Sequence, residues 1–234
     1  MTEYIQREAA DGERCGRLNI LALDTAFGEI AACILTQEQV HISTADASRS
    51  GKTRSTSIVP VIDQLLDQAG LGWQQLDLLA FGAGPGSFTG LRIGAATLAG
   101  INASLHLPVV HLSSLAITAR QVETEECVQV LEDARAGEVF VGCYHHGQAM
   151  QEDTCLNWQD IQEQKSGLFC CHGEPPVRLD GWQRLPLSYP RSRALVMEAE
   201  AVCMQVCDFS VVPVYPVPVY LQLSQAERQA HGQG

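Results

Sequence analysis

A glycine-rich loop between an apolar strand and an apolar helix constrains this chain more than any other feature. The loop at residues 83–94 reads AGPGSFTGLRIG and follows the apolar run Leu76–Phe81. Gly84, Gly86 and Gly90 permit positive φ angles and a close approach of other backbone. The first amides of the following helix lack partners within that helix. The sequence therefore predicts a strand–loop–helix unit whose loop contacts an anion or the backbone of another segment.

The loop lacks the standard fingerprints of nucleotide sites and hydrolases. A P-loop closes on Gly-Lys-Ser/Thr, whereas Gly90 is followed here by Leu91. Thr89 stands where the dinucleotide-binding pattern needs its third glycine. A serine hydrolase that uses Ser87 is an alternative, although Ser87 lacks the glycine spacing of a nucleophile elbow. A phosphate site at the helix N-terminus and a turn that only packs the helix both stay open.

The composition is that of a globular chain from a reducing compartment. The 234 residues are 46% hydrophobic and 18% charged, which suits one large domain or two lobes. The net charge of −12 argues against a broad nucleic-acid surface, because such surfaces rely on Lys and Arg. Nine cysteines without a Cys-x-x-Cys pair or a signal peptide indicate the cytoplasm. No apolar run is long enough to cross a membrane.

Strands alternate with helices over the first half of the chain, which indicates an α/β fold. Residues 1–17 are polar, contain Gly12 and Gly16, and predict a flexible extension, whereas residues 148–212 show no clear pattern. Apolar runs and turn residues predict strands at 18–23, 29–35, 40–44, 76–81, 109–110 and 127–131, and helices at 57–69, 91–105 and 115–120.

Three motifs in a fixed order carry a resemblance to a known family. They are ILALDT at 20–25, GPGSFTGLRIG at 84–94 and DARAGEVF at 133–140. With them the chain resembles the TsaB family, formerly YeaZ, over residues 18–144 and more weakly at 214–221. The resemblance implies a two-lobed α/β fold of the actin-like ATPase and sugar-kinase class, with mixed sheets flanked by helices.

We expect an N-terminal lobe at 18–112, a C-terminal lobe at 113–223 and flexible ends at 1–17 and 224–234. Two positions depart from the family pattern. Arg54 lies where relatives commonly carry a His before the first helix, and Gln222 lies where a basic residue is usual. Both departures put local contacts in question rather than the fold.

The resemblance also implies a role in bacterial threonylcarbamoyladenosine synthesis on tRNA. In that family the chain is a non-catalytic partner that binds, scaffolds and activates its paralogue TsaD. TsaD transfers threonylcarbamoyl to the adenosine beside the anticodon, the ATPase TsaE joins the pair, and TsaC makes the intermediate. The resemblance implies contact with tRNA only through this complex, a homodimer as a further assembly, and no cofactor of its own, with ATP or ADP at the junction of the complex.

The residues themselves support a non-catalytic assignment. The TsaD active site holds a metal through a His-x-x-x-His pair on one helical turn, and this chain has no such pair. Ser114 and Thr118 fall at the two positions, and neutral hydroxyls are poor ligands for a transition metal. His145 and His146 are expected on opposite sides of a strand. We therefore assign no catalytic residue and no metal ligand.

Two helices, at 57–69 and 91–105, are predicted to form the interface with TsaD or with a second copy. The second helix is rich in Gly and Ala, which suits either internal packing or a subunit contact between helices. The residues predicted to contact the partner are Ile58, Ile62, Leu65, Leu91, Gly94, Ala95 and Leu98.

A remnant nucleotide site is the last prediction, since the first motif ends where actin-like ATPases bind phosphate and magnesium. An Asx turn that closes the hairpin after Asp24 is the other interpretation. An independent ATPase or phosphotransferase that uses Asp24 is accordingly the alternative function. The residues predicted for this nucleotide or anion site are Asp24, Thr25, Gly84, Gly86, Ser87, Thr89 and Gly90.

Overall fold

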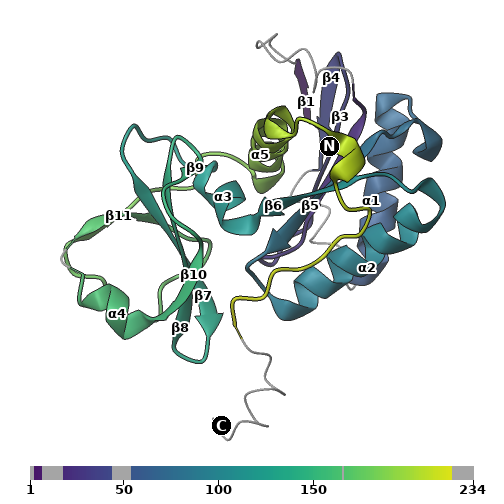
Figure 1. The fold of residues 1–234 in the computed structure, drawn as a ribbon. Coiled ribbons are helices and arrows are strands. Elements are labelled where there is room, and N and C mark those ends of the chain that lie inside the picture. Colours follow the sequence, from purple (N-terminus) through teal and green to yellow (C-terminus); the bar gives the residue numbers. More distant parts are fainter. Residues whose placement is uncertain (1–2, 7–17, 44–53, 165, 223–234) are drawn as a thin grey trace, which may run out of the picture.

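The protein has two lobes, each built on a β-sheet with helices packed against it (Figure 1). This computed structural model describes residues 3–6, 18–43, 54–164 and 166–222. The architecture confirms the predicted α/β class with two mixed sheets. No helix in the described part of the chain is both long enough and apolar enough to cross a membrane.

The first lobe holds a six-stranded sheet. Its strands are β1 (Glu3–Gln6), β2 (Ile20–Asp24), β3 (Ala31–Leu35), β4 (Gln39–Ile42), β5 (Leu78–Gly84) and β6 (Val109–Ser113). They lie in the order β1-β4-β3-β2-β5-β6. Strands β1 to β4 pair antiparallel, whereas β2, β5 and β6 run parallel. The parallel part follows from the helical crossovers that connect these strands.

Helices cover both faces of this sheet. Helices α1 (Arg54–Ala69) and α2 (Phe88–Leu105) lie on one face, and α5 (Arg191–Gln205) lies on the other (Figure 1). Alternate residues of β2 therefore enter different cores. Leu21 and Leu23 pack with α1 and α2, whereas Ile20 and Ala22 pack with α5. Burial on both faces explains why the strand is an unbroken apolar run.

The second lobe holds a sheet in the order β10-β8-β7-β11-β12, with β9 paired to β8. Helix α3 (Ser114–Ala119) packs on one face through Leu115 and Ala116, and α4 (Trp158–Gln162) packs on the other through Trp158 and Ile161. The strands are β7 (Val128–Arg135), β8 (Glu138–His145), β9 (Gln148–Ala149), β10 (Thr154–Asn157), β11 (Gly167–Cys170) and β12 (Trp182–Arg184), and two short 3-10 helices lie at Trp73–Gln75 and Phe209–Val211.

The C-terminal part of the chain returns to the first lobe, which differs from the expected lobe boundary. Helix α5 falls within 113–223, yet Ala194, Leu195 and Ala199 pack in the core of the first sheet. After α5, residues 213–222 form an extended segment, here called the strap, that runs beside α2 (Figure 1). The first sheet needs α5 because α1 and α2 cover only one of its two apolar faces.

The predicted strands and helices of the first 135 residues are all present. The structure differs in an earlier start of α2 and in one additional strand. Helix α2 begins at Phe88 because Ser87 caps it, with the Ser87 side chain accepting a hydrogen bond from the Gly90 amide. Within the extension predicted to be flexible, Glu3–Gln6 forms β1 and pairs with β4, which would otherwise be a sheet edge. The remainder of that extension, residues 44–53 and the predicted tail at 224–234 lie outside the described residues.

Candidate functional site

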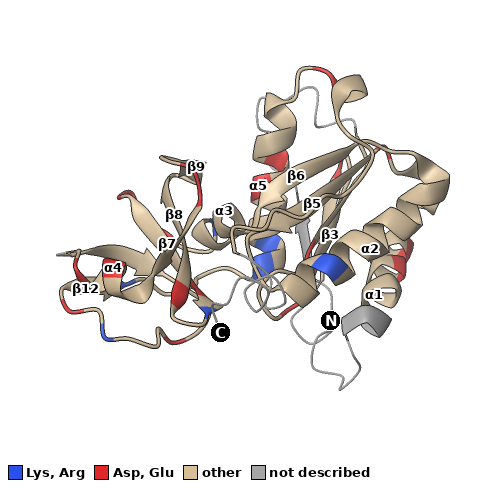
Figure 2. Cartoon of the chain, turned by 60° about the horizontal axis from the view of Figure 1, so that its bottom comes forward, with Lys and Arg blue, Asp and Glu red and all other residues tan. Residues whose placement is uncertain are grey.

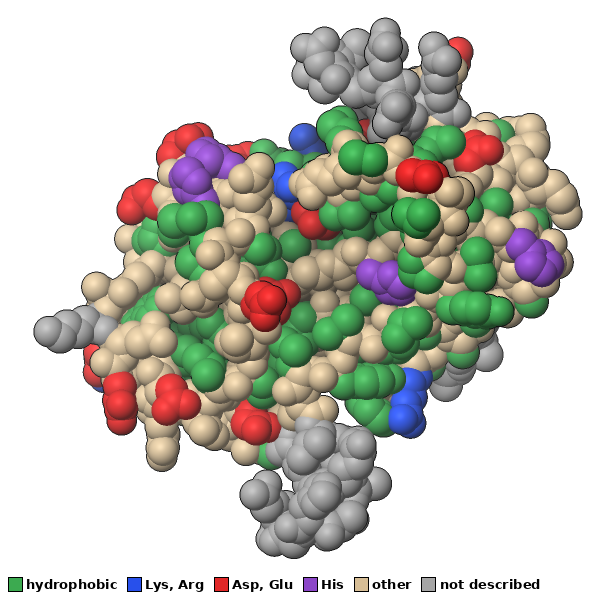
Figure 3. All heavy atoms as spheres, viewed as in Figure 1, with side chains coloured by type: hydrophobic (Ala, Val, Ile, Leu, Met, Phe, Trp, Pro, Cys, Tyr) green, Lys and Arg blue, Asp and Glu red, His purple; other side chains and the backbone are tan. Residues whose placement is uncertain are grey.

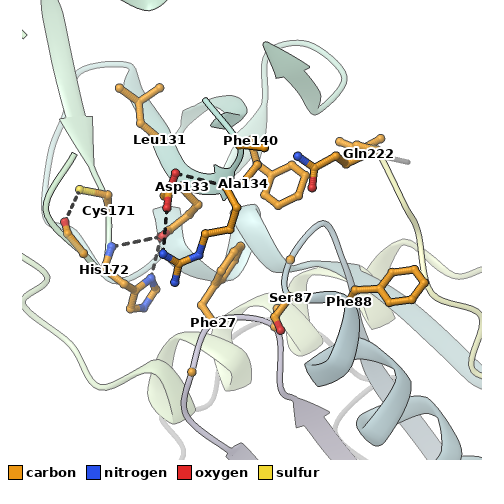
Figure 4. Close-up of a pocket in the computed structure, with 18 of the residues that line it drawn as sticks. Phe27, Ser87, Phe88, Leu131, Asp133, Ala134, Phe140, Cys171, His172 and Gln222 are labelled. Atoms are coloured by element: carbon orange, nitrogen blue, oxygen red, sulfur yellow. Dashed lines mark hydrogen bonds and ion pairs between the residues drawn. The ribbon is translucent and has the colours of Figure 1, made fainter. Parts of the chain in front are cut away.

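A cleft of about 1400 Å³ lies between the two lobes (Figure 4). The β2–β3 hairpin and the start of α2 form its first-lobe wall, whereas β7 and residues 171–175 form the opposite wall. Phe27 and Ser87 lie across the cleft from Asp133 and His172 (Figure 4). The strap closes one side with residues 219–222.

The glycine loop is held by backbone contacts with the β2–β3 hairpin. The Ser87 amide donates to the Ala26 carbonyl at 2.9 Å. A Cβ at Gly86 would lie 2.6 Å from the Ala26 Cβ, so glycine is needed there for close approach. Among the three glycines predicted to permit positive φ, Gly84 alone uses it, at 115°. The loop thus packs against backbone, which is one of the two interpretations left open by the sequence.

A buried ion pair lies beneath this loop. Asp24 is 0% exposed and Arg191 of α5 is 2% exposed. The Arg191 Nε donates to Asp24 Oδ2 at 2.6 Å, and a second guanidinium nitrogen also contacts that oxygen. The other Asp24 oxygen accepts from the Ser114 hydroxyl and from the Ala26 amide, both at 3.1 Å. The amide contact is an Asx turn, which agrees with the second interpretation of Asp24.

The same guanidinium contacts Ser114 and Thr118, the two residues predicted to fall at the positions of the TsaD histidines. Arg191 donates to the Thr118 hydroxyl at 2.8 Å and to the Ser114 carbonyl at 2.9 Å. Both residues are 0% exposed. The Arg191 guanidinium therefore lies at the centre of this polar cluster. Asp24 is engaged by it and is not available to a ligand in the cleft.

Four of the seven residues predicted for the nucleotide or anion site are therefore misplaced for that role. Asp24, Thr25, Gly84 and Gly90 are buried within the first lobe, and the Thr25 hydroxyl donates to the Gly90 carbonyl at 2.8 Å. The prediction is corrected because the strand end that would hold magnesium is neutralised by Arg191. The remaining three, Gly86, Ser87 and Thr89, line the cleft.

The opposite wall carries a second buried carboxylate, Glu132, which no sequence motif predicted. Glu132 is 4% exposed and lies 2.6 Å from the His172 Nδ1. The imidazole stacks on Phe27, with ring centroids 5.8 Å apart. The Arg191 guanidinium lies over the same Phe27 ring at 5.1 Å. Phe27 thus connects the buried ion pair of one lobe with the carboxylate–histidine pair of the other.

The third motif, at residues 133–140, contains an ion pair on the surface. The Arg135 and Asp133 charges lie 3.4 Å apart, and the Arg135 side chain is 90% exposed. Water screens such a pair, so it contributes about 1 kcal/mol or less. Glu138 accepts a hydrogen bond from Gln222 of the strap. One of the two departures from the family pattern thus joins the strap to the second lobe.

The predicted interface residues face the interior, so that part of the prediction is corrected. Ile58, Ile62, Leu65, Leu91 and Leu98 are at most 2% exposed. Their helical spacing marks the face that packs on the chain's own sheet. Gly94 is also buried, and it packs so closely that a Cβ there would lie 2.5 Å from the Thr25 hydroxyl. Only Ala95 is partly exposed among the seven.

The two neighbouring histidines also differ from their prediction. His146 has a φ of 49°, which turns its ring to within 4.2 Å of the His145 ring instead of to the opposite side. Cys203 is buried, whereas Cys207 lies beyond the end of α5 and is exposed. No group of three potential metal ligands occurs among the described residues.

A further polar cluster joins the lobes beside the cleft. Asp153 accepts hydrogen bonds from the hydroxyls of Ser113, at the end of β6, and Tyr144, on β8. Burial raises the pKa of Asp153, and the two hydrogen bonds oppose this rise. Burial also raises the pKa of Glu198 on α5, which pairs with Arg120 at 2.9 Å. Both carboxylates therefore favour their protonated forms more than exposed carboxylates do.

We expect the unfolding free energy of an Asp153→Asn variant, relative to that of the parent protein, to be higher at pH 7 than at pH 4.5. A raised pKa in the folded state stabilises the fold below the ordinary carboxyl range, and that contribution is lost as the pH rises through the folded pKa. Asn cannot ionise and still reaches both hydroxyls. Urea unfolding at pH 4.5 and pH 7 measures the difference, with Glu152→Gln, an exposed neighbour, as the control. A difference between Asp153→Asn and the parent that is equal at both pH values contradicts the expectation.

Comparisons with known proteins agree with this geometry. Residues 46–160 match the family model of TsaD, tRNA N6-adenosine threonylcarbamoyltransferase. The chain is 39% identical over 127 residues to the "tRNA threonylcarbamoyladenosine biosynthesis protein TsaB" of Haemophilus influenzae, a match that covers 53% of this chain and 52% of that relative. The TsaB of Escherichia coli is 26% identical over 237 residues, covering 92% of this chain and 99% of the relative.

A solved structure extends the likeness to the fold. "YeaZ from Pseudomonas aeruginosa" superposes with a TM-score of 0.68 at 25% identity, covering 87% of this chain and 100% of that chain. The sequence matches and this superposition cover both lobes and the strand–loop–helix unit between β5 and α2. Together they show that the chain is similar to the TsaB/YeaZ family along both lobes.

Proposed function

We propose that this chain acts in threonylcarbamoyladenosine biosynthesis on tRNA, in the cytoplasm, as a non-catalytic partner that binds, scaffolds and activates a TsaD-type transferase. Similarity to the TsaB/YeaZ family supports the pathway. The match of residues 46–160 to the TsaD family model supports a common origin with the transferase. In this proposal TsaE joins the pair, TsaC supplies the threonylcarbamoyl intermediate, and tRNA is held by the assembled complex.

The contacts of Arg191 are the observation that carries the non-catalytic assignment. In this proposal Ser114 and Thr118 replace the two histidines through which a TsaD-type transferase binds its metal. The Arg191 guanidinium donates hydrogen bonds to the Thr118 hydroxyl and to the Ser114 carbonyl. The guanidinium brings a fixed positive charge to the place where an ion would otherwise be needed to neutralise Asp24. The polar cluster is complete without an ion, which suits a structural subunit.

The outward faces of α1 and α2 are the proposed partner surface, in place of the buried residues first predicted. On α2 the exposed positions follow the spacing i, i+3, i+4 and i+7, and a Cβ at Gly100 would meet no atom within 4 Å. Small side chains let a partner helix approach closely. The partner is a TsaD-type chain or, in a homodimer, a second copy. The exposed residues of this stripe are Ala96, Ala99, Gly100 and Ala103.

A nucleotide at the junction of the complex is a subsidiary proposal. Its phosphates would meet Gly86, Ser87 and Thr89 at the N-terminus of α2, where the helix dipole favours an anion. Arg92, the one basic residue of α2, lies one turn further along and also lines the cleft (Figure 2). An independent ATPase is disfavoured because Asp24 is engaged by Arg191.

Threonylcarbamoyl transfer to an unmodified tRNA transcript tests the proposal. The reaction contains cognate TsaD, TsaE and TsaC with threonine, bicarbonate and ATP, and the modified nucleoside is measured by mass. We expect multiple turnovers only when this chain is present. Equal product without the chain contradicts the proposal.

An Ala99→Arg variant tests the surface. We expect it to fold normally and to weaken binding to TsaD about tenfold or more, because a long charged side chain separates the two helices. Ala149→Arg, the same change at an exposed position on β9, is the matched control and should bind as the parent does. Unchanged affinity of Ala99→Arg would move the interface away from α2.

A further inference from the structure

Backbone groups of the strap make three hydrogen bonds with β5 and β6, and the Val214 carbonyl accepts a fourth from the Asn102 side chain of α2. The Val109 amide donates to the Pro213 carbonyl at 2.7 Å, and the Val219 amide donates to the Ala83 carbonyl at 2.7 Å. Between them, the Val217 amide donates to the Nε2 of His111 at 2.9 Å. The middle bond is the one of the three whose acceptor can take up a proton.

The chemistry of imidazole makes this bond dependent on protonation. An imidazole nitrogen accepts a hydrogen bond only when it carries no proton, and both ring nitrogens are donors in the imidazolium form. Protonation of His111 Nε2 would place an N–H against the Val217 N–H. The two flanking bonds end on carbonyl oxygens, which do not titrate near neutral pH.

The strap carries features that such a release would expose or move. Tyr215, Val217 and Val219 are large apolar residues that remain 70%, 57% and 47% exposed, and apolar side chains are frequent on the face of the molecule seen in Figure 3. Tyr220 packs on Phe88 of α2 with ring centroids 4.8 Å apart. Residues 219–222 also form one wall of the cleft.

We propose that His111 is a pH-dependent fastener of the strap: its neutral ring accepts the hydrogen bond of the Val217 amide, and its protonation breaks that bond and releases the strap around Val217 from the β6 edge. The release loosens the strap between its two flanking bonds, next to residues 219–222, which line the cleft. The inference is independent of the proposed role in tRNA modification, because it rests only on contacts within this chain.

The surroundings of the ring favour the neutral state. The Phe81 ring of β5 packs edge-on against the His111 ring at 6.3 Å, and the strap contributes the backbone of Tyr215 and Val217. Burial lowers the pKa of His111, an effect that outweighs the opposing hydrogen bond with the Tyr215 backbone. No charged group of the described residues contributes to this shift, and Tyr215 is the titratable residue that the strap brings to the ring.

The lowered pKa of His111 determines how stability changes with pH. A lowered pKa means that the neutral ring contributes stability, which is fully present above the ordinary histidine range near 6.5 and is lost as the pH falls through the lowered folded pKa. The fastener is therefore closed at neutral pH and opens only in mild acid.

Amide hydrogen exchange of the full chain, followed by NMR from pH 7.5 to pH 5, tests the proposal. After correction for the intrinsic pH dependence of exchange, we expect protection of the Val217 amide to fall roughly two- to tenfold in acid, the loss of one hydrogen bond. The Val109 and Val219 amides should keep their protection. The His111 ring resonances should titrate with the same midpoint as the Val217 amide.

Two variants at His111 distinguish protonation of this ring from a general effect of acid on the protein. His111→Gln keeps an acceptor that does not titrate, so its Val217 amide should stay protected at every pH. His111→Phe removes the acceptor and should show low protection throughout. If Val217 loses protection in acid equally in His111→Gln, or if the His111 ring titrates in the parent protein without a change at Val217, the proposal is wrong.

Discussion

An Arg191→Met variant is expected to lose about 3–5 kcal/mol of unfolding free energy, because removal of one partner leaves a buried charge uncompensated. Asp24 is 0% exposed, and Arg191 supplies its only cation among the described residues. The substitution also removes the donors to the Thr118 hydroxyl and the Ser114 carbonyl. Urea unfolding at pH 7 measures the loss.

Two comparisons show whether the loss comes from the buried charge. Arg178→Met removes an arginine that is 88% exposed and pairs with an 80% exposed Asp180, and it should cost about 1 kcal/mol or less. The double variant Asp24→Asn/Arg191→Met should be more stable than Arg191→Met alone, because no unpaired charge remains. A loss below about 1 kcal/mol in Arg191→Met would show that Asp24 is neutralised in another way.

A Gly94→Leu variant is expected to lose about 3 kcal/mol of unfolding free energy or more, because it overpacks the contact between α2 and the sheet. A Cβ at this position already lies 2.5 Å from the Thr25 hydroxyl and 3.2 Å from the Phe81 ring. Both residues are fully buried and have little room to move. Thermal unfolding and the retained fraction of soluble monomer measure the effect.

Gly100→Leu is the matched control on the same helix. A Cβ at Gly100 meets no atom within 4 Å, so this variant should remain folded and, as part of the proposed partner surface, should weaken only the binding to TsaD. A stable Gly94→Leu monomer would contradict the packing seen here. It would return Gly94 to the surface role first predicted for it.

An amphipathic pattern predicts which face of a helix is covered, but not what covers it. Ile58, Ile62 and Leu65 share one face of α1, and the sequence correctly indicates that this face is covered. The pattern does not say whether the cover is a partner or the chain's own sheet. Because each sheet needs helices on its apolar faces, the fold itself uses this surface. The proposed partner surface therefore uses the small exposed residues of α2 instead.

In the cleft, too, the sequence predicts contacts between neighbouring residues but not contacts between residues far apart in the chain. The glycine loop predicted a strand–loop–helix unit, and Gly86 is indeed required, although for its approach to Ala26 rather than for a positive φ. Glu132 and His172 could not be paired in advance, since 40 residues separate them and most of that stretch lies beyond the recognisable motifs.

What the sequence determined by itself is local: alternating apolar runs that form strands and helices, a loop in which small residues permit close approach, and motifs whose order identifies the family. What only the tertiary structure decided is which groups meet. Asp24 and Arg191 lie 167 residues apart, and their contact depends on α5 returning to the face of the first sheet that α1 and α2 leave open. Burial then makes that pairing obligatory, because a charge removed from water must find its counter-charge within the fold.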